Sequence, residues 1–163
     1  MKKIKTFLVI LFILCLSSVA FAFKATWNGK VVSVHDGDTI TIERSGLIYK
    51  IRLYGVDCPE LMQSEGYAAQ KFAEDLVKDK DVVVDVKALD RYGRYVGIVY
   101  VEGMSLNEEL LVNGLAWEYP TYCKLKAICH KYRELEFYAK KNKLGLWGKS
   151  EDPVPPWMYR KHK

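Results

Sequence analysis

The chain has 163 residues, of which 50% are hydrophobic and 28% charged, so it is long enough to bury one sizeable core, and it has no low-complexity block. Its formal net charge is +5, but removing the N-terminal Lys2, Lys3 and Lys5 from the 25 basic residues leaves 22 against 20 acidic ones. This mild balance excludes binding of nucleic acid by total charge alone, so any attraction for phosphate must come from local placement of charge.

The N-terminus has the features of a secretory signal. Basic residues precede an apolar stretch, Phe7–Leu16, and the small-x-small pattern of Ala20-Phe21-Ala22 follows it. The apolar stretch is short for a bilayer span, which needs about 20 residues. Cys15 raises the alternative of a lipoprotein site, but Leu14 precedes it where a small residue is expected. We therefore expect a signal peptide over residues 1–22, and a secreted or periplasmic mature chain without stable membrane association.

Alternating apolar residues predict a meander of strands at the start of the mature chain. The pattern covers Val31–His35, Thr39–Glu43 and Ile48–Tyr54, with Ser45-Gly46 as the turn before the third strand. The spacing then becomes helical over Ser64–Lys78, where apolar residues recur every four positions.

Two more strands and two helices follow. Period-two spacing predicts strands at Asp81–Lys87 and Val96–Tyr100. Ser105-x-x-Glu108 is a capping box that begins a short helix, and Gly114 is suited to end it in a left-handed conformation. The last helix is expected over Ala127–Lys143.

Three strands, a helix, two strands and two helices are the order of an α+β protein built on a five-stranded Greek-key barrel, the OB-fold, with three helices. Other small α+β folds share this order. We assign the domain to residues 23–150 and a proline-rich tail to residues 151–163. The prolines of Asp152–Trp157 disfavour a helix or central strand, so an extended tail is expected.

Three cysteines remain in the mature chain, and an exported protein meets oxidising conditions. Cys123 and Cys129 are six residues apart and can close a small loop as a disulfide. Cys58 would then be an unpaired cysteine. The alternative is a zinc site that recruits His130 beside Cys129, although the spacing matches no paired Cys-x-x-Cys site.

Carboxylates lie at the ends of the predicted strands. Asp38 and Asp57 follow neighbouring strands and can converge on one hard divalent cation, which prefers oxygen ligands. The alternative for the first of them is a plain turn, because Asp36-Gly37-Asp38 has good turn composition.

Glu60 and Arg52 flank the second carboxylate in sequence. Pro59 favours an extended backbone at Cys58. This backbone can aim the Cys58 carbonyl at a metal and hold Glu60 at a fixed position relative to Asp57. A carboxylate near a metal-bound phosphate can orient or deprotonate water, whereas most glutamates are only solvated. Arg52 can bind phosphate oxygens in a bidentate manner, or form a structural ion pair with Asp57 or Glu60.

Two further groups offer contacts for a nucleic acid. The segment Asp90–Arg94 places Arg94 and the phenol of Tyr92 in one loop, although charged hairpin loops also have this composition. Tyr119 and Tyr122 can stack on a base, or serve ordinary packing in a chain with 11 tyrosines.

Taken together and in order, these motifs resemble those of the staphylococcal nuclease family from about residue 30 to residue 147. The matching segments are Asp36-Gly37-Asp38-Thr39, Arg52-Leu53-x-Gly55-Val56-Asp57-x-Pro59-Glu60, Asp90-x-Tyr92-Gly93-Arg94, and Asn107-x-x-Leu110-Leu111-Val112-x-Gly114-Leu115-Ala116. Four ordered motifs make a chance match very rare.

The resemblance implies a monomeric hydrolase that cleaves phosphodiester bonds of DNA and RNA, preferably single-stranded, with one Ca²⁺ ion and 3′-phosphate products. It assigns the metal ligands to Asp38, Asp57 and the Cys58 carbonyl. It assigns catalysis to Arg52, Glu60 and Arg94, and substrate binding to Tyr92, Tyr119 and Tyr122. The alternatives are a non-catalytic OB-fold that binds single strands, and a zinc-stapled structural protein of the cell envelope.

Some positions depart from the family pattern. Leu61–Gly66 is short and lacks a run of lysines, so substrate capture is expected to differ. Counting from Ala116 puts Tyr122 at a family stacking position, whereas the other position falls on Pro120, one residue after Tyr119. The base preference is therefore not carried over from the family.

Overall fold

The computed structural model describes residues 25–162, so the predicted signal peptide lies outside the described residues. Five strands form a closed barrel, as the sequence predicted. They are β1 (Ala25–Asp36), β2 (Thr39–Arg44), β3 (Leu47–Leu53), β5 (Asp81–Leu89) and β6 (Tyr95–Val101). Their order in the sheet is β3-β2-β1-β5-β6, and a parallel pairing of β3 with β6 closes it. The short β7 (Met104–Ser105) adds to the edge of β6.

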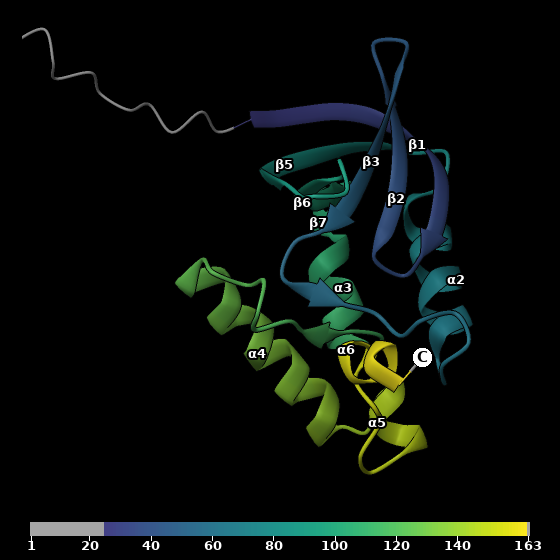
Figure 1. The fold of residues 1–163 in the computed structure, drawn as a ribbon, viewed down its shortest axis with the longest axis vertical. Coiled ribbons are helices and arrows are strands. Elements are labelled where there is room, and N and C mark those ends of the chain that lie inside the picture. Colours follow the sequence, from purple (N-terminus) through teal and green to yellow (C-terminus); the bar gives the residue numbers. More distant parts are fainter. Residues whose placement is uncertain (1–24, 163) are drawn as a thin grey trace, which may run out of the picture.

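The helices cover the barrel from different sides (Figure 1). Helix α2 (Gly66–Val77) packs on β1, and α3 (Leu106–Val112) packs on β6 and on α4 (Lys126–Lys141). The buried faces of α2 and α3 complete one core with the interior of the barrel. None of the helices over residues 25–162 is long and apolar enough to cross a membrane.

The capping signals around α3 are confirmed. The Ser105 side chain accepts a hydrogen bond from the backbone N–H of Glu108 at 3.4 Å. Gly114 has a φ of +70°, and an added Cβ would lie 2.2 Å from the Leu144 carbonyl, so only glycine fits this helix end. Buried Asn107 ties α3 to the barrel, because it donates to the Tyr54 carbonyl and accepts from the Val99 N–H.

A separate two-stranded ladder joins β4 (Val56–Asp57) to β8 (Trp117–Glu118), with Asp57 opposite Trp117. The loop after β8 returns toward α4 and is tied to that helix by a disulfide between Cys123 and Cys129, whose Cα atoms are 5.7 Å apart. Cys58 is free and buried. The disulfide therefore holds the loop that contains Tyr119 and Tyr122 next to the strand that carries Asp57.

Replacing both Cys123 and Cys129 with serine is expected to lower the free energy of unfolding by about 2 kcal/mol, because the open loop gains conformational entropy in the unfolded chain. Urea unfolding of the double variant, compared with the oxidised parent, measures this loss. Thiol titration of the oxidised mature protein should find one thiol, Cys58. Three thiols in that titration would contradict the pairing.

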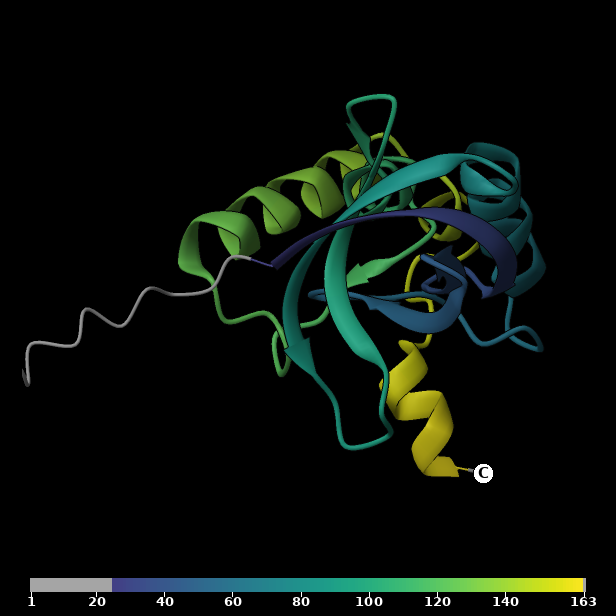
Figure 2. The ribbon, with the colours of Figure 1, turned by 90° about the horizontal axis from the view of Figure 1, so that it is seen from above.

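The prediction of an extended tail was wrong for its second half. After α5 (Leu146–Lys149) the chain runs extended through Pro153 and Pro155, but α6 (Pro156–Tyr159) and a 3-10 turn (Arg160–His162) follow. Pro156 occupies the first turn of α6, where the missing N–H has no helical partner to lose. In Figure 2, α6 and the turn after it project from the molecule on the side away from α4.

Candidate active site

Two buried carboxylates converge on one guanidinium at the end of the barrel strands. Asp38 lies in the turn directly before β2 and Asp57 lies in β4, and their side chains are at most 2% exposed. Arg52 of β3 pairs in register with Thr39, the neighbour of Asp38. Its Nη1 donates to Asp38 and its Nη2 to Asp57 at 2.5 Å. The expected ion pair of Arg52 with Asp57 is therefore present, and it also brings the predicted metal ligands together.

The turn before β2 fixes the direction of Asp38. Its backbone N–H donates to the Asp36 carboxylate at 3.0 Å, so the alternative of a plain Asx turn also holds. A Cβ on Gly37 would lie 2.8 Å from the side chains of Ala69 and Cys58, so this turn packs closely against its neighbours. The Cys58 N–H donates to the second oxygen of Asp38 at 2.7 Å. The carboxylate is therefore held from two separate segments, by Arg52 of β3 and by the backbone of Cys58.

The electrostatics of the pair favour a cation. Burial raises the pKa of Asp38 well above its usual range, against the opposing effect of Arg52, while Asp36 and Asp57 add to the rise. For Arg52, burial would lower the pKa, but Asp38 and Asp57 raise it, so the guanidinium stays charged. Two buried carboxylates that share one positive partner are a site where additional positive charge is strongly attracted.

These residues fit a hard divalent cation. Asp38 and Asp57 already point their oxygens at one shared cationic group, and carboxylate oxygen is the donor that Ca²⁺ prefers. The backbone N–H of Cys58 contacts Asp38, whereas no described contact fixes the Cys58 carbonyl, which stays a predicted ligand. Burial raises the pKa of the Cys58 thiol, with Asp38 adding to the rise, which favours the protonated thiol.

Glu60 lies at the exposed rim of the same site. Its backbone N–H donates to the Gln63 side chain at 2.9 Å, which fixes the loop between β4 and α2. Its carboxylate is 38% exposed and is linked to Asp57 through one guanidinium that contacts both. A solvent-facing carboxylate beside a buried pair of carboxylates is placed where water can reach it.

Arg94 and Tyr92 are not joined to the carboxylates directly. Arg94 directly precedes Tyr95, the first residue of β6. Tyr95 pairs with Ile51 of β3, which is the neighbour of Arg52, so Arg94 lies close in register to Arg52. Its Nε donates to Asp90 at 2.8 Å, and its guanidinium lies 5.5 Å from the ring of Tyr92. Over the described part of the chain, Arg94 makes no hydrogen bond or ion pair with Asp38, Asp57 or Glu60.

The two predicted stacking tyrosines are in contact. The rings of Tyr119 and Tyr122 have centroids 4.8 Å apart, and Tyr122 is 59% exposed. The Tyr119 N–H donates to the Gly55 carbonyl at 2.9 Å, which anchors this loop beside β4. Tyr119 also stacks on Trp157 of α6, whose ring is parallel within 6° at a centroid distance of 5.1 Å.

Sequence reasoning missed Arg160, the guanidinium that links Asp57 and Glu60. Arg160 lies 100 residues after Glu60 in sequence, within the basic run Arg160-Lys161-His162-Lys163, which has no distinguishing pattern. Trp157 was also missed, because the tail was expected to be extended. Only the three-dimensional course of the tail brings either residue to the site.

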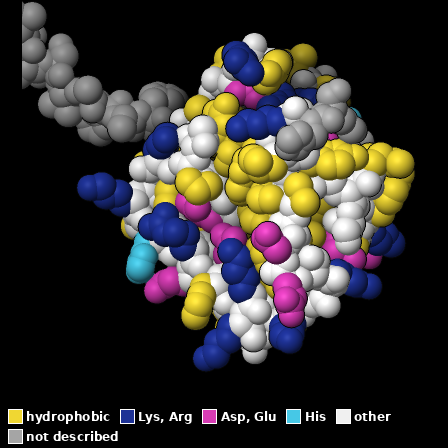
Figure 3. Space-filling view, turned by 60° about the horizontal axis from the view of Figure 1, so that its bottom comes forward, with side chains coloured by type: hydrophobic (Ala, Val, Ile, Leu, Met, Phe, Trp, Pro, Cys, Tyr) yellow, Lys and Arg dark blue, Asp and Glu magenta, His cyan; other side chains and the backbone are white. Residues whose placement is uncertain are grey.

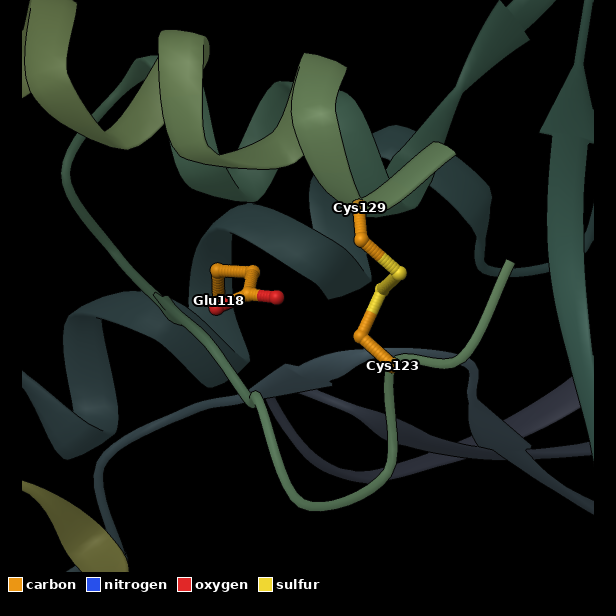
Figure 4. A group of neighbouring side chains, drawn as sticks. All are labelled: Glu118, Cys123 and Cys129. Carbon is orange, nitrogen blue, oxygen red and sulfur yellow. A yellow bond between two sulfur atoms is a disulfide. The ribbon is translucent and has the colours of Figure 1, made fainter. Parts of the chain in front are cut away.

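A second group of potential ligands lies around the disulfide. Glu118 points toward Cys123 and Cys129, and ligand atoms of the three residues lie within 4.8 Å of one another (Figure 4). Both sulfurs are consumed by the disulfide and cannot act as thiolate ligands, so the zinc alternative is not supported here. His130 instead lies 3.4 Å from Glu134 on the exposed face of α4.

Comparison with known proteins gives a consistent picture. Residues 50–149 match the family model described as "Staphylococcal nuclease homologue". A protein from Escherichia coli O157:H7 named an uncharacterized endonuclease is 39% identical over 137 residues, covering 83% of this chain and 86% of that protein.

Two other relatives carry more specific names. A micrococcal nuclease from Shigella flexneri is 33% identical over 147 residues, covering 84% of this chain and 82% of that protein. A probable staphylococcal-like nuclease from Oryza sativa subsp. japonica is 34% identical over 132 residues, which are 81% of this chain and 32% of the rice protein.

Proposed function

This chain belongs to the staphylococcal nuclease family and is a hydrolytic nuclease, and from that premise we propose that it is an exported, Ca²⁺-dependent enzyme that cleaves single-stranded or melted DNA and RNA. The observation that carries the proposal is the bridging of buried Asp38 and Asp57 by Arg52, with Glu60 at the exposed rim. This is the arrangement that cleavage of a phosphodiester needs: a cation site, a water-handling carboxylate and a guanidinium for phosphate.

The residues of the site have separate tasks. When bound, Ca²⁺ supplies a Lewis acid for a phosphate oxygen and a position for a water molecule. Asp38 and Asp57 would hold the ion through their carboxylate oxygens. The guanidinium of Arg52 stabilises the negative charge that grows on the phosphate oxygens as the water oxygen attacks phosphorus.

Glu60 orients the attacking water and takes up its proton as the new P–O bond forms. The bond from phosphorus to the 5′ oxygen then breaks, and that oxygen leaves with a proton from solvent, which gives a 3′-phosphate and a 5′-hydroxyl. Arg94 stabilises charge on the phosphate from the side of the β5–β6 loop, after exchanging its contact with Asp90 for one with substrate.

Export is proposed from the N-terminal signal pattern, and the disulfide of Cys123 and Cys129 fits an oxidising compartment. Preference for single strands is proposed from the exposed Tyr122 and its neighbour Tyr119, since stacking on aromatic rings needs unpaired bases.

The proposal is tested by digesting denatured DNA and RNA with the mature protein in Ca²⁺ or in chelator. We expect cleavage in Ca²⁺ only, with 3′-phosphate ends, and a loss of about 100-fold in Arg94→Ala because one charge-stabilising group is removed. Arg44→Ala is the matched control, since Arg44 lies over Trp27 on the barrel wall and should leave the rate unchanged.

Two outcomes would contradict this proposal. Salt-sensitive binding of single strands without cleavage would favour the non-catalytic OB-fold module. Full activity of Arg94→Ala in a folded protein would remove Arg94 from the reaction and leave its contact with Asp90 as a purely structural one.

A further inference from the structure

The C-terminal tail enters the active site. Arg160 donates from Nη2 to Asp57 at 2.8 Å and from Nη1 to Glu60 at 2.8 Å, with a further contact from Nη1 to Asp57 at 3.3 Å. It therefore touches one predicted metal ligand and the predicted water-handling residue at once. Burial would lower the pKa of Arg160, but its hydrogen bonds to Asp57 and Glu60 raise it, so the group is charged.

Several contacts dock the tail in this position. The Gln63 side chain donates to the Val154 carbonyl at 3.0 Å, and the same side chain accepts from the Glu60 N–H. Pro156 is buried, and Trp157 stacks on Tyr119 and meets the edge of Trp117 at 6.4 Å. The tail thus contacts both the loop after Glu60, through Gln63, and the loop that contains Tyr119. Arg160 therefore extends from a segment whose position is fixed by packing.

The charge balance of the site leaves a place for this guanidinium. Four carboxyl groups, those of Asp36, Asp38, Asp57 and Glu60, lie in or beside the site, and burial disfavours the charged form of Asp38 while Arg52 opposes that effect. With a divalent cation bound and all four groups ionised, the cation and Arg52 would supply three positive charges against four negative ones. Arg160 would balance the remaining negative charge. Figure 3 shows the face at the end of the molecule where α5 and α6 lie in Figure 1. Hydrophobic, acidic and basic side chains are mixed on this face, so attraction for phosphate there depends on individual guanidinium groups.

We propose that Arg160 is a further phosphate-binding residue of this active site, supplied by the C-terminal tail and positioned by the stacking of Trp157 on Tyr119. This inference rests on the proposed nuclease function. The buried Asp38–Asp57 pair takes the divalent cation, and Arg160 keeps its contact with Glu60. Its other N–H donors then bind the scissile phosphate. This is the phosphate that is attacked by the water molecule oriented by Glu60.

Geometry and donor capacity favour this role. Arg160 is 39% exposed and Glu60 38%, so both lie on the open side of the site, from which substrate arrives, whereas Asp57 is fully buried behind them. The contacts with the two carboxylates use three of the five N–H donors of a guanidinium, and a phosphate can accept from the others. The alternative is that Arg160 inhibits the enzyme by competing with the cation for Asp57, and it predicts the opposite change in rate.

The test compares Arg160→Ala, Arg160→Lys and Lys161→Ala in the full mature chain at saturating Ca²⁺. Lys161 is exposed and carries the same charge one residue away, so it controls for net charge. For hydrolysis of denatured DNA we expect kcat/KM to fall about 100-fold in Arg160→Ala, to recover in part in Arg160→Lys, and to stay near the parent value in Lys161→Ala.

A binding measurement separates this inference from the proposed function. Thymidine 3′-phosphate, which resembles a product end and has no phosphodiester bond to cleave, is titrated in Ca²⁺ and followed by tryptophan fluorescence, and its affinity should fall about tenfold in Arg160→Ala. If the parent does not cleave DNA but still binds this nucleotide through Arg160, the nuclease proposal fails and the phosphate-binding role stands. Equal or faster cleavage by Arg160→Ala, with unchanged affinity, would overturn the role.

Discussion

Replacing Arg52 with alanine will lower the free energy of unfolding by about 3–5 kcal/mol in the absence of divalent cations and will abolish measurable hydrolysis. Arg52 is the positive partner that Asp38 and Asp57 share, and both carboxylates are buried. Removing one partner of a buried ion pair leaves uncompensated charge in a medium of low polarity, and that cost is large. Hydrolysis is lost because the guanidinium that stabilises charge on the phosphate is gone.

Urea unfolding with and without Ca²⁺ measures the effect on stability. Because a divalent cation can neutralise the same two carboxylates, we expect Ca²⁺ to stabilise Arg52→Ala by more than it stabilises the parent. Arg44→Ala serves as the control, since it removes an arginine whose described contact is with Trp27. A loss of stability under 1 kcal/mol in chelator would show that Arg52 is not the main partner of the buried pair.

The sequence predicted the barrel and the approach of Asp38 to Asp57, with an Arg52–Asp57 ion pair as one alternative, because these depend on short-range signals; the contact of Arg52 with Asp38 was not predicted. Period-two spacing marked the strands, and adjacent strands of a meander must lie side by side, so residues at their ends meet. The register of Arg52 with Thr39 is a direct consequence of the Ser45-Gly46 turn. Local chain geometry was sufficient to bring these residues together.

The tail could not be predicted in the same way. A helix of four residues gives no periodic signal, and the prolines that disfavour a helix interior are tolerated at its first turn, where Pro156 lies. The contact of Arg160 with Glu60 spans 100 residues, and it depends on the packing of Trp157 against an aromatic loop. Tertiary packing of this kind is not encoded in local spacing, so the basic end of the chain looked like an ordinary solvated tail.

The position of Arg94 shows a second limit. Its motif predicted a phosphate contact, but in the structure its guanidinium is held by Asp90 within the loop. Burial would raise the pKa of Asp90, but hydrogen bonds from the backbone and side chain of Arg94 lower it, which keeps the ion pair formed. The motif therefore identified Arg94 correctly as a charged loop residue, but it did not predict that Arg94 pairs with Asp90 in the absence of substrate.

Replacing Glu60 with glutamine will reduce the rate of hydrolysis by about 10²- to 10⁴-fold while the protein stays folded. The side chain is 38% exposed and its described partner is Arg160, so the loss of one negative charge removes a surface ion pair of small energetic weight. The amide has nearly the same shape but cannot accept the proton of the attacking water. Cleavage of denatured DNA at saturating Ca²⁺, with thermal unfolding in parallel, measures both parts.

The exchange of Glu65 for glutamine is the matched control, because it removes the same charge from the same loop five residues later without touching the site. If Glu60 only balanced charge, Glu60→Gln would change the affinity for Ca²⁺ or for an oligonucleotide by a factor similar to its change in rate. If it handles the water, kcat falls while both affinities stay near the parent values, because glutamine retains the shape and the contact distance to Arg160. A folded Glu60→Gln with parental kcat would contradict the water-handling role of Glu60.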